Sequence, residues 1–357
     1  MEDTREPARS AHGPIVARAA PAVAALLAAG LFGAATPLSK VLLREAPPAQ
    51  LAGLLYLGAA IGLLPVVVWQ HRRSRPIGRR GEIRLAGAIA FGGVVGPLLL
   101  LLGLQLAAAT SVSLWLNMEL VATAVLGQLF FREHLAWPGW VGVTGVALAG
   151  IILAGVEAGS GPLAAMLVTL ACVCWGLDNH LTALIDEMSA TRTTFWKCGV
   201  AGTVNLLLGI ATQPLAASAT VIGMAVVVGA LSYGASIVLY VSSAQHLGAT
   251  RTQLLFATAP FFGLALSAAL LAEPVTGAHL VAAALMVAAI GLVFAARHGH
   301  PHAHAALAHT HVHRHDDGDH THDHGEAVPV VHAHWHEHQP VVHEHTHWPD
   351  LHHRHAH

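Results

Sequence analysis

The chain contains ten apolar runs, each close to the length that a helix needs to cross a lipid bilayer. They occupy residues 20–42, 48–69, 84–106, 109–131, 138–156, 163–185, 195–212, 220–243, 250–272 and 276–296. A hydrocarbon core about 30 Å thick requires about 20 apolar residues in an α-helix. The runs lack the alternation of apolar and polar residues that membrane barrels show, and only helices and closed barrels satisfy their backbone inside lipid. The sequence therefore predicts an all-α integral membrane protein with ten transmembrane helices.

The composition excludes several other classes of protein. Hydrophobic residues make up 54% of the chain and charged residues 11%, against about 25% charged in soluble domains. The three cysteines all lie in apolar runs, which predicts packing residues and no disulfide framework. A formal net charge of −2 gives no indication of a nucleic-acid partner. The sequence contains no nucleophile elbow, phosphate loop or zinc-protease motif, which argues against an enzyme.

Basic residues predict how the spans are oriented. The loop between the second and third runs is rich in arginine: Arg72, Arg73, Arg75, Arg79, Arg80 and Arg84. Lys40 and Arg44 are the basic residues near the opposite side. Cytoplasmic loops carry an excess of lysine and arginine. We therefore expect a bacterial plasma (inner) membrane protein with both termini in the cytoplasm, including a disordered segment at residues 1–18.

One membrane segment occurs twice. The sequence TSVSLWLNMELVATAVLGQLFFRE at residues 110–133 returns in altered form as TRTQLLFATAPFFGLALSAALLAEP at residues 250–274. Two copies of five runs follow, over residues 19–156 and 160–297. Because five is odd, the second copy lies inverted relative to the first. Inverted repeats are typical of secondary transporters, which bind substrate near the midplane of the bilayer at the repeat interface.

Three short motifs carry a family resemblance. LFGAATPLSK at residues 31–40, CWGLDN at residues 174–179 and LAEP at residues 271–274 resemble the motifs of the EamA family in the drug/metabolite transporter superfamily. The resemblance covers roughly residues 19–297. It implies ten helices, cytoplasmic termini and movement of small metabolites by alternating access, often as export. Ala183 replaces the lysine of the first repeat and His134, in place of proline, follows Glu133, so we expect the two halves to differ in function.

Glu119 is a carboxylate near the middle of the fourth run. A charge there costs about 2.5–3.5 kcal/mol on insertion scales, so it marks a functional site by default. Ser111, Trp115, Glu119 and Thr123 recur every fourth residue, which predicts one shared helix face, and Asn117 adds a polar group nearby. We interpret this face as lining a substrate pathway, where Glu119 binds a cationic group or takes up a proton. The alternative is a structural glutamate that ties two helices together.

Other polar positions are weaker candidates for the same pathway. Asp178 and Asn179 interrupt the sixth run, with Trp175 one turn earlier; Asp178 either lines the pathway or faces water at the cytoplasmic end. Lys40 either contacts an anionic substrate or extends to the membrane interface. Pro37 interrupts the first run, and a broken helix exposes backbone groups only where protein or a cavity satisfies them.

A histidine-rich tail follows the last run. Residues 298–357 hold 22 of the 28 histidines, mostly in His-x-His alternation, and we expect this cytoplasmic segment to be disordered. Imidazole suits Zn²⁺, Ni²⁺, Cu²⁺ and Co²⁺, so we expect the tail to bind a divalent metal although no cofactor is required. The candidate ligands are His309, His311, His313, His315, His320, His322 and His324.

Three functional hypotheses follow. The first is a secondary transporter, in export, of a small metabolite or drug-like molecule, coupled to protons through Glu119. The second is a divalent-metal transporter or homeostasis protein whose tail collects or senses the ion. The third is a membrane-anchored metal-storage scaffold, which needs neither an inverted repeat nor an intramembrane carboxylate. The repeat and Glu119 therefore favour transport.

Overall fold

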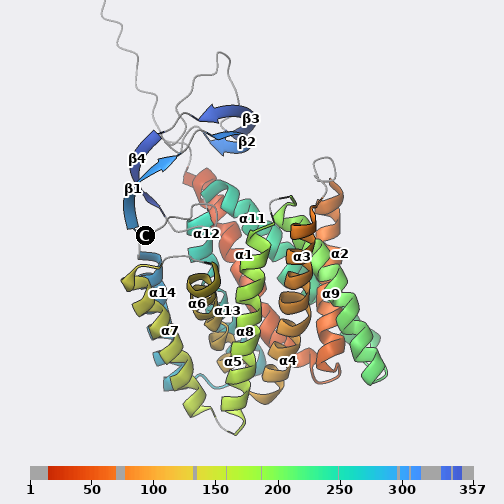
Figure 1. Ribbon diagram of the computed structural model, residues 1–357. Coiled ribbons are helices and arrows are strands. Elements are labelled where there is room, and N and C mark those ends of the chain that lie inside the picture. The colour runs from red at the N-terminus through yellow and green to blue at the C-terminus, as the bar shows by residue number, and fades with distance from the viewer. Residues whose placement is uncertain are drawn as a thin grey trace, which may run out of the picture. The chain divides into compact units, whose positions relative to one another are not determined.

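A computed structural model of the protein (Figure 1) consists of a helical unit and a tail unit, and each is described by itself. It describes residues 15–69, 77–131, 135–157, 159–185, 187–247, 249–295, 298–304, 307–314, 331–338 and 341–347.

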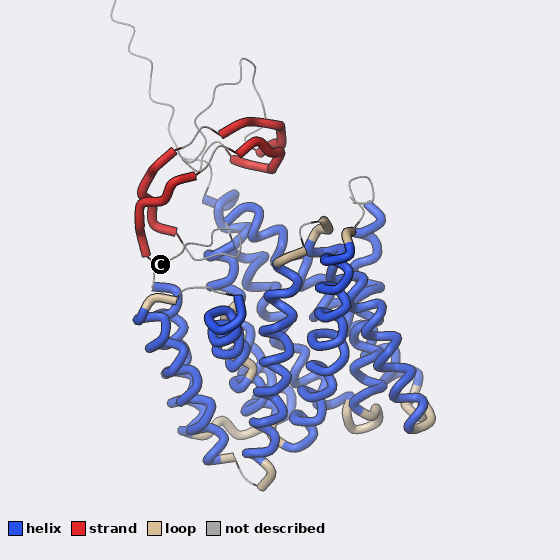
Figure 2. Tube along the Cα trace, viewed as in Figure 1, coloured by secondary structure: helices blue, strands red, loops and turns tan. Residues whose placement is uncertain are grey.

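The helical unit is built from consecutive helices that cross the bundle (Figure 2). In chain order they are α1 (Ile15–Leu42), α2 (Pro48–Trp69), α3 (Arg79–Ala88), η2 (Ile89–Val95), α4 (Gly96–Leu106), α5 (Ala109–Trp115), α6 (Met118–Leu126), η3 (Gly127–Phe131), α7 (Trp137–Val156), α8 (Gly161–Ala183), α9 (Ala190–Thr212), α10 (Ala219–Val228), η4 (Gly229–Ala235), α11 (Ser236–Leu247), α12 (Ala249–Phe256), α13 (Ala259–Leu271) and α14 (Gly277–Ala295). Elements labelled η are π-helical.

Joined end to end, these elements form the predicted spans. Within the described residues, nine helical stretches are long and apolar enough to cross a membrane, and a shorter apolar helix covers Gly277–Val293. They coincide with the ten predicted runs to within a few residues, which confirms an all-α membrane protein with multiple spans. The first helix begins at Ile15, so residues 15–18 are helical where disorder was predicted; residues 1–14 lie outside the described part.

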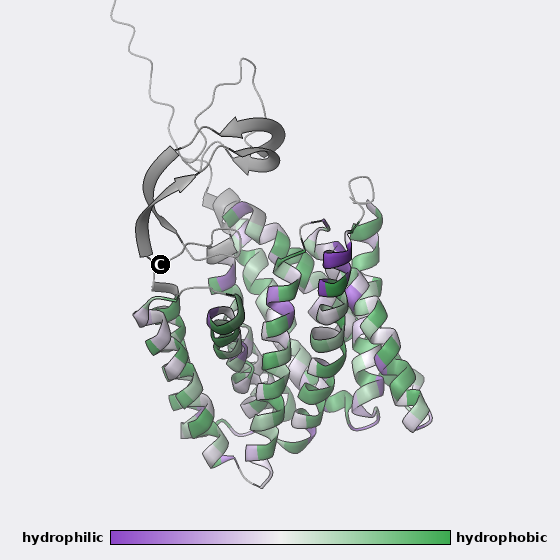
Figure 3. Ribbon diagram, in the orientation of Figure 1, coloured by the Kyte–Doolittle hydropathy of each residue, from purple (hydrophilic) through white to green (hydrophobic). Residues whose placement is uncertain are grey.

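The outer surface of the bundle is apolar, as lipid requires. Trp69 is 85% exposed, Ile151 67% and Leu207 63%, and α7 is hydrophobic along its length (Figure 3). Helices meet through small residues: a Cβ on Gly53 of α2 would lie 2.5 Å from the Leu206 nitrogen of α9. Since lipid tails are as apolar as leucine, close approach at small residues is what holds such helices together.

The fourth and ninth spans are both broken near their middle. α5 ends at Trp115 and α6 begins at Met118, whereas α12 ends at Phe256 and α13 begins at Ala259. At each break a backbone amide bonds to the carbonyl oxygen three residues earlier. The amide of Asn117 donates to the Leu114 oxygen at 3.1 Å, and the amide of Thr258 donates to the Leu255 oxygen at 3.2 Å.

The break corrects the predicted single face of the fourth span. Ser111 and Trp115 belong to α5, whereas Glu119 and Thr123 belong to α6. Tight i to i−3 bonds change the rotation per residue, so the four side chains do not continue one stripe.

Two π-helical segments occupy equivalent places in the two repeats. η2 begins at Ile89 and η4 at Gly229, and each covers seven residues. The starting positions differ by 140 (229 − 89), the same offset as Thr110 and Thr250 in the repeated sequence. A π-helical turn inserts an extra residue into a helix and is frequent at functional sites.

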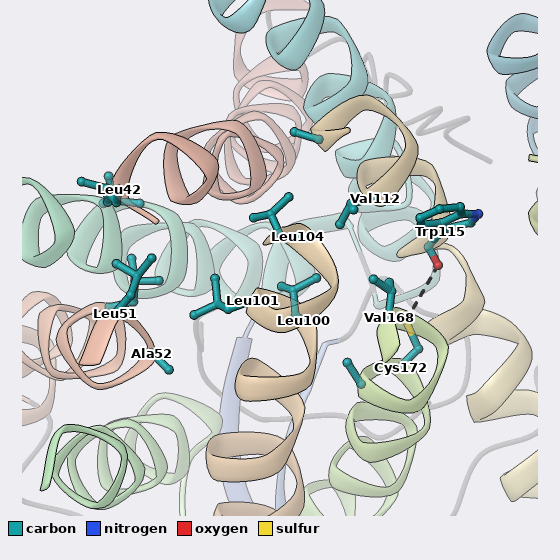
Figure 4. Packing of buried hydrophobic residues seen from close by; sticks show 14 of the residues in the cluster. Leu42, Leu51, Ala52, Leu100, Leu101, Leu104, Val112, Trp115, Val168 and Cys172 are labelled. Carbon is teal, nitrogen blue, oxygen red and sulfur yellow. Dashed lines mark hydrogen bonds between the residues drawn. The ribbon is translucent and has the colours of Figure 1, made fainter. Parts of the chain in front are cut away.

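The centre of the bundle is a cluster of buried leucines, alanines and one tryptophan (Figure 4). Leu101, Leu104 and Trp115 are at most 2% exposed, and the thiol of Cys172 lies 3.9 Å from the Trp115 carbonyl oxygen. All three cysteines are free, with Cys172 and Cys198 buried and Cys174 partly so. The prediction that the cysteines are packing residues is confirmed for Cys172 and Cys198.

The tail unit contains four strands, β1 (His298–His304), β2 (Leu307–Arg314), β3 (Val331–His338) and β4 (Val341–His347). β1 pairs with β4 and β2 with β3, both antiparallel. The described tail residues thus differ from the predicted disorder. The reason is their two-residue alternation of histidine with valine, threonine and alanine, which is a strand period.

Candidate functional site

Glu119 is held across the interface between the two repeats. It lies in α6 of the first repeat, and its Oε1 accepts a hydrogen bond of 2.8 Å from Nδ2 of Asn179 in α8 of the second. Glu119 is partly exposed and Asn179 is exposed. This bond joins two residues that the sequence predicted separately as pathway residues.

An ion pair with a buried carboxylate and a partly buried ammonium lies next to this bond. The Lys197 ammonium of α9 is 2.6 Å from Oδ2 of Asp178 in α8, with side chains 16% and 5% exposed. Thr182 donates to the other carboxylate oxygen at 2.9 Å. Asp178 therefore has a partner at each oxygen and does not simply face water.

Sequence reasoning missed Lys197. The predicted seventh run began at residue 195, which placed this lysine at the edge of a span, where lysines commonly reach the interface. The helix begins at Ala190, so Lys197 lies about two turns inside it. The signal that could have revealed Lys197 was a lysine inside an apolar run, three residues from the end of a loop that contains arginine.

The π-helical segment η2 packs beside this ion pair. The carbonyl of Gly92 accepts hydrogen bonds from Trp175 Nε1 at 3.0 Å and from the Tyr56 hydroxyl at 2.9 Å. The neighbouring Gly93 carbonyl accepts one of 3.0 Å from Asn205 Nδ2. Side chains of α2, α8 and α9 thus satisfy backbone oxygens that the irregular helix leaves free, as the membrane interior demands.

Gly92 also makes room for the ion pair. A Cβ at this position would lie 2.0 Å from Asp178 Oδ2 and 2.3 Å from its Cγ. Only glycine allows η2 and the carboxylate to approach this closely.

We call Glu119, Asn179, Asp178 and Lys197 the interface cluster. Glu119 interacts electrostatically with both members of the ion pair. When all groups are ionised, two carboxylates face one ammonium, so the cluster has a surplus of one negative charge. Such a cluster can bind a cationic group or exchange a proton.

A second polar group lies at the end of the bundle where α5 begins. The amides of Ala109 and Thr110 donate to the Glu273 carboxylate at 3.0 and 2.8 Å. The amide of Ala108 and the hydroxyl of Ser111 donate to Glu157. Ala108 occupies the N-cap position and has no side-chain oxygen to cap the helix, so two distant carboxylates cap it instead.

Lys40 belongs to this second group. Its ammonium donates to the Leu104 oxygen at 2.5 Å and to the Ala107 oxygen at 2.9 Å. It lines a cavity of about 390 Å³ with Arg44, Gln105 and Glu273 among the other residues. Lys40 is thus bonded to the carbonyl end of α4 instead of extending to the interface.

Removal of the Glu273 cap tests this arrangement. Glu273→Ala is expected to lower the free energy of unfolding by about 1–2 kcal/mol, because two amide groups at a helix N-terminus lose their acceptor. The measurement is thermal unfolding of the purified protein in detergent. Glu45→Ala, which removes an exposed carboxylate bonded to Ser218, is the matched control. Equal stability of the two variants would show that Glu273 does not cap α5.

The remaining predicted residues lie outside the interface cluster. Trp115 is 1% exposed and donates from Nε1 to the Gly150 oxygen of α7 at 3.1 Å. Asn117 donates to the Leu114 oxygen and to the Met286 sulfur of α14. Thr123 packs closely against Gly176, and Pro37 lies within α1. Of the nine predicted pathway residues, the structure brings Glu119, Asp178 and Asn179 together in the interface cluster, and Trp175 donates to the neighbouring Gly92.

Comparison with known proteins agrees with this architecture. The chain is 26% identical over 291 residues to an "Uncharacterized transporter" of Methanothermobacter thermautotrophicus, covering 74% of this chain and 82% of that protein. A solved structure described as "Crystal structure of protein" has a TM-score of 0.57 at 16% identity, covering 77% of this chain and 98% of that one. This second likeness concerns the fold alone.

The family follows from the two halves of the chain. Residues 20–156 and residues 162–295 each match the EamA-like transporter family. The two matches cover most of the chain and coincide with the two five-helix repeats that the sequence predicted. The resemblance drawn from the three short motifs is thereby confirmed. The protein is a member of the EamA-like transporter family.

Proposed function

We propose that the protein is a secondary transporter that exports a small metabolite or drug-like molecule by alternating access, with proton coupling at Glu119. The observation that carries this proposal is the hydrogen bond from Asn179 to Glu119, which crosses the repeat interface beside the Asp178–Lys197 ion pair. Transport itself follows from the family; the substrate class, direction and coupling are the proposal.

The position of Glu119 supports a coupling role. It lies about halfway along the span Ala109–Phe131, directly after the break between α5 and α6. In transporters built from inverted repeats, discontinuous helices form the ion and substrate sites near the midplane of the bilayer. A carboxylate there releases its proton readily only when water or a cationic partner reaches it, so its protonation depends on which side is open.

The bonds around Glu119 supply a mechanism for this dependence. Motion of one repeat against the other must alter the Glu119–Asn179 bond, because its two ends lie on different repeats. Loss of the amide partner disfavours the ionised carboxylate. Opening of the interface thus favours uptake of a proton by Glu119. Re-formation of the Glu119–Asn179 bond favours release of that proton. In this proposal the protein lies in the bacterial plasma membrane, with the arginine-rich loop and both termini in the cytoplasm.

The first experiment finds a substrate. A deletion strain of a bacterial host is screened for growth against metabolites, toxic organic cations and the salts of Zn, Ni, Co and Cu, with and without the full-length protein. The compound whose tolerance depends on the protein becomes the probe. Flux of this probe is then measured in proteoliposomes over a pH series.

Glu119→Gln tests the coupling. We expect the variant to lose the dependence of flux on the pH gradient, with gradient-driven flux lowered at least tenfold, because the amide carries no exchangeable carboxyl proton. Glu45→Gln removes an exposed carboxylate and is expected to transport like the wild type. If Glu119→Gln responds to the pH gradient as the wild type does, the coupling assignment is wrong even though the protein remains a transporter.

A further inference from the structure

His279 is a buried histidine in the first turn of α14, and the transport proposal does not use it. It is 5% exposed and is the only titratable residue of that helix. Both ring nitrogens have partners. Nδ1 lies 3.2 Å from the Thr276 amide nitrogen and 2.8 Å from the Thr276 hydroxyl oxygen, and Nε2 lies 3.0 Å from the Ser111 hydroxyl oxygen. These partners determine the protonation state of the ring.

Two contacts assign the proton of the neutral ring to Nε2. A backbone N–H can only donate, so the Thr276 amide requires Nδ1 to be an unprotonated acceptor. The Ser111 hydroxyl has one hydrogen, which it donates to the Glu157 carboxylate. Its oxygen therefore accepts a hydrogen bond from His279 Nε2. The imidazole, the serine and the carboxylate thus form a directed chain of hydrogen bonds.

The contact between Thr276 and His279 is a capping box that depends on charge. α14 begins at Gly277, so Thr276 is the N-cap residue and His279 occupies position N3. In a capping box the N3 side chain accepts a hydrogen bond from the N-cap amide, and that side chain is usually glutamate or glutamine. An imidazole accepts this bond only while Nδ1 carries no proton. Protonation of His279 therefore removes the cap of α14.

The same histidine joins the two repeats at the end of the bundle where α5 begins. α14 belongs to the second repeat, whereas Ser111 of α5 and Glu157 at the end of α7 belong to the first. Glu273, which precedes α14, accepts hydrogen bonds from two backbone amides of α5. The N-terminus of α14 and the N-terminus of α5 are thus held together through His279 and through Glu273.

Opposing influences act on the charge of His279. Burial and the capping box favour the neutral ring, whereas the carboxylates of Glu157 and Glu273 attract an imidazolium. Lys40 of α1 interacts with both carboxylates. The helices α5 and α7, which pack on α14, carry no titratable side chain of their own. Thr276 is exposed and Glu157 partly so, so water can reach the chain of hydrogen bonds at either end.

We propose that His279 is a proton-binding site that switches the contact between the repeats at this end of the bundle. The neutral ring caps α14 and bonds to Ser111. When a proton from water binds the lone pair of Nδ1, the Thr276 amide loses its acceptor, and the new positive charge opposes the helix dipole. The imidazolium then moves from Ser111 toward the two carboxylates, and the first turn of α14 opens. This inference goes beyond the transport proposal and does not depend on coupling at Glu119.

Hydrogen exchange of the full-length protein in detergent tests the switch. Protection factors, the ratios of intrinsic to measured exchange rates, are compared at about pH 8 and about pH 5, the range in which histidine changes charge. The two segments compared are residues 274–283 and residues 108–113. In the wild type we expect protection in both segments to fall about tenfold or more at the lower pH, because local opening exposes their amides.

His279→Gln is the matched variant, since glutamine is a usual acceptor at N3 and does not titrate. We expect its protection in residues 274–283 to be equal at the two pH values. Glu157 and Glu273 remain in this variant, so any effect of their own titration persists in it. His246→Gln removes an exposed histidine of α11 and is expected to respond to pH as the wild type does.

Ser111→Ala separates the cap of α14 from the link between the repeats. Alanine leaves the contact between Thr276 and His279 in place but removes the middle of the hydrogen-bond chain. Residues 274–283 are then expected to respond to pH, whereas residues 108–113 no longer do. The inference is overturned if the wild type shows equal protection at both pH values, if His279→Gln responds as the wild type does, or if residues 108–113 still respond in Ser111→Ala.

Discussion

Gly229→Ala is expected to destabilise the protein by about 3 kcal/mol or more, because the new methyl group has no space. A Cβ at this position of η4 would lie 1.9 Å from the Leu55 carbonyl oxygen of α2, and 2.7 Å from its carbon. Both are backbone atoms inside a helix, which no change of rotamer removes. α2 and η4 must therefore separate, and the contact between the two repeats that they form is lost.

The measurement is thermal unfolding in detergent together with the yield of monodisperse protein. Gly223→Ala is the matched control, since it makes the same substitution in the same span and its Cβ would meet nothing within 4 Å. Alanine there improves helix propensity by up to about 1 kcal/mol. Equal stability of the two variants would show that α2 and η4 do not approach as closely as the structure places them.

Lys197→Met is expected to lower the free energy of unfolding by about 3–5 kcal/mol, because it leaves the Asp178 carboxylate buried without its cation. Asp178 is 3% exposed and accepts a further bond from Thr182, which does not replace a full positive charge. The same variant should also lose transport, since the surplus charge of the interface cluster rises from one to two.

The double variant Asp178→Asn with Lys197→Met serves as the internal control. It removes both charges, so we expect it to recover a large part of the stability lost in Lys197→Met. Thermal unfolding of the wild type, the two single variants and the double variant gives the coupling energy directly. A double variant no more stable than Lys197→Met would contradict a direct ion pair.

The spans could be predicted because hydropathy and length decide them. Lipid surrounds every span, so each run of about twenty apolar residues must be helical whatever its neighbours are. Hydropathy and length do not predict the helix breaks in the fourth and ninth spans. Pro260 marks the one in the ninth span, but the fourth span has no proline, and its break depends on local bonds at Asn117 that the apolar pattern conceals.

The interface cluster could be predicted only in part. Glu119 and Asp178 are anomalous in apolar runs and were found for that reason. Their pairing with Asn179 and Lys197 depends on how α6, α8 and α9 pack, which residue spacing within one helix does not determine. Gly92 is important through the space it leaves beside Asp178, and one sequence does not distinguish such a glycine from an ordinary packing residue.

The tail shows the same limit at longer range. The strand period of His-x-His is visible in the sequence, but the partner of His309 is 27 positions away, at His336. Register between strands that distant is decided by pairing in three dimensions. The sequence therefore shows the strand period of the tail but does not determine which strands pair. Four of the predicted metal ligands lie outside the described residues: His315, His320, His322 and His324.

The broken helices and the π-helical segments have a consequence for the history of the chain. Both features occur at matching places in the two halves, with η2 and η4 beginning 140 positions apart. Features shared in this way are most simply inherited from a single five-helix ancestor that existed before its gene was duplicated. In the same sequence alignment, Glu119 of the first copy corresponds to Ala259 of the second. The two copies have therefore diverged at this position. Both descendant halves supply the specialised chemistry, since Glu119 comes from the first and Asp178, Asn179 and Lys197 come from the second.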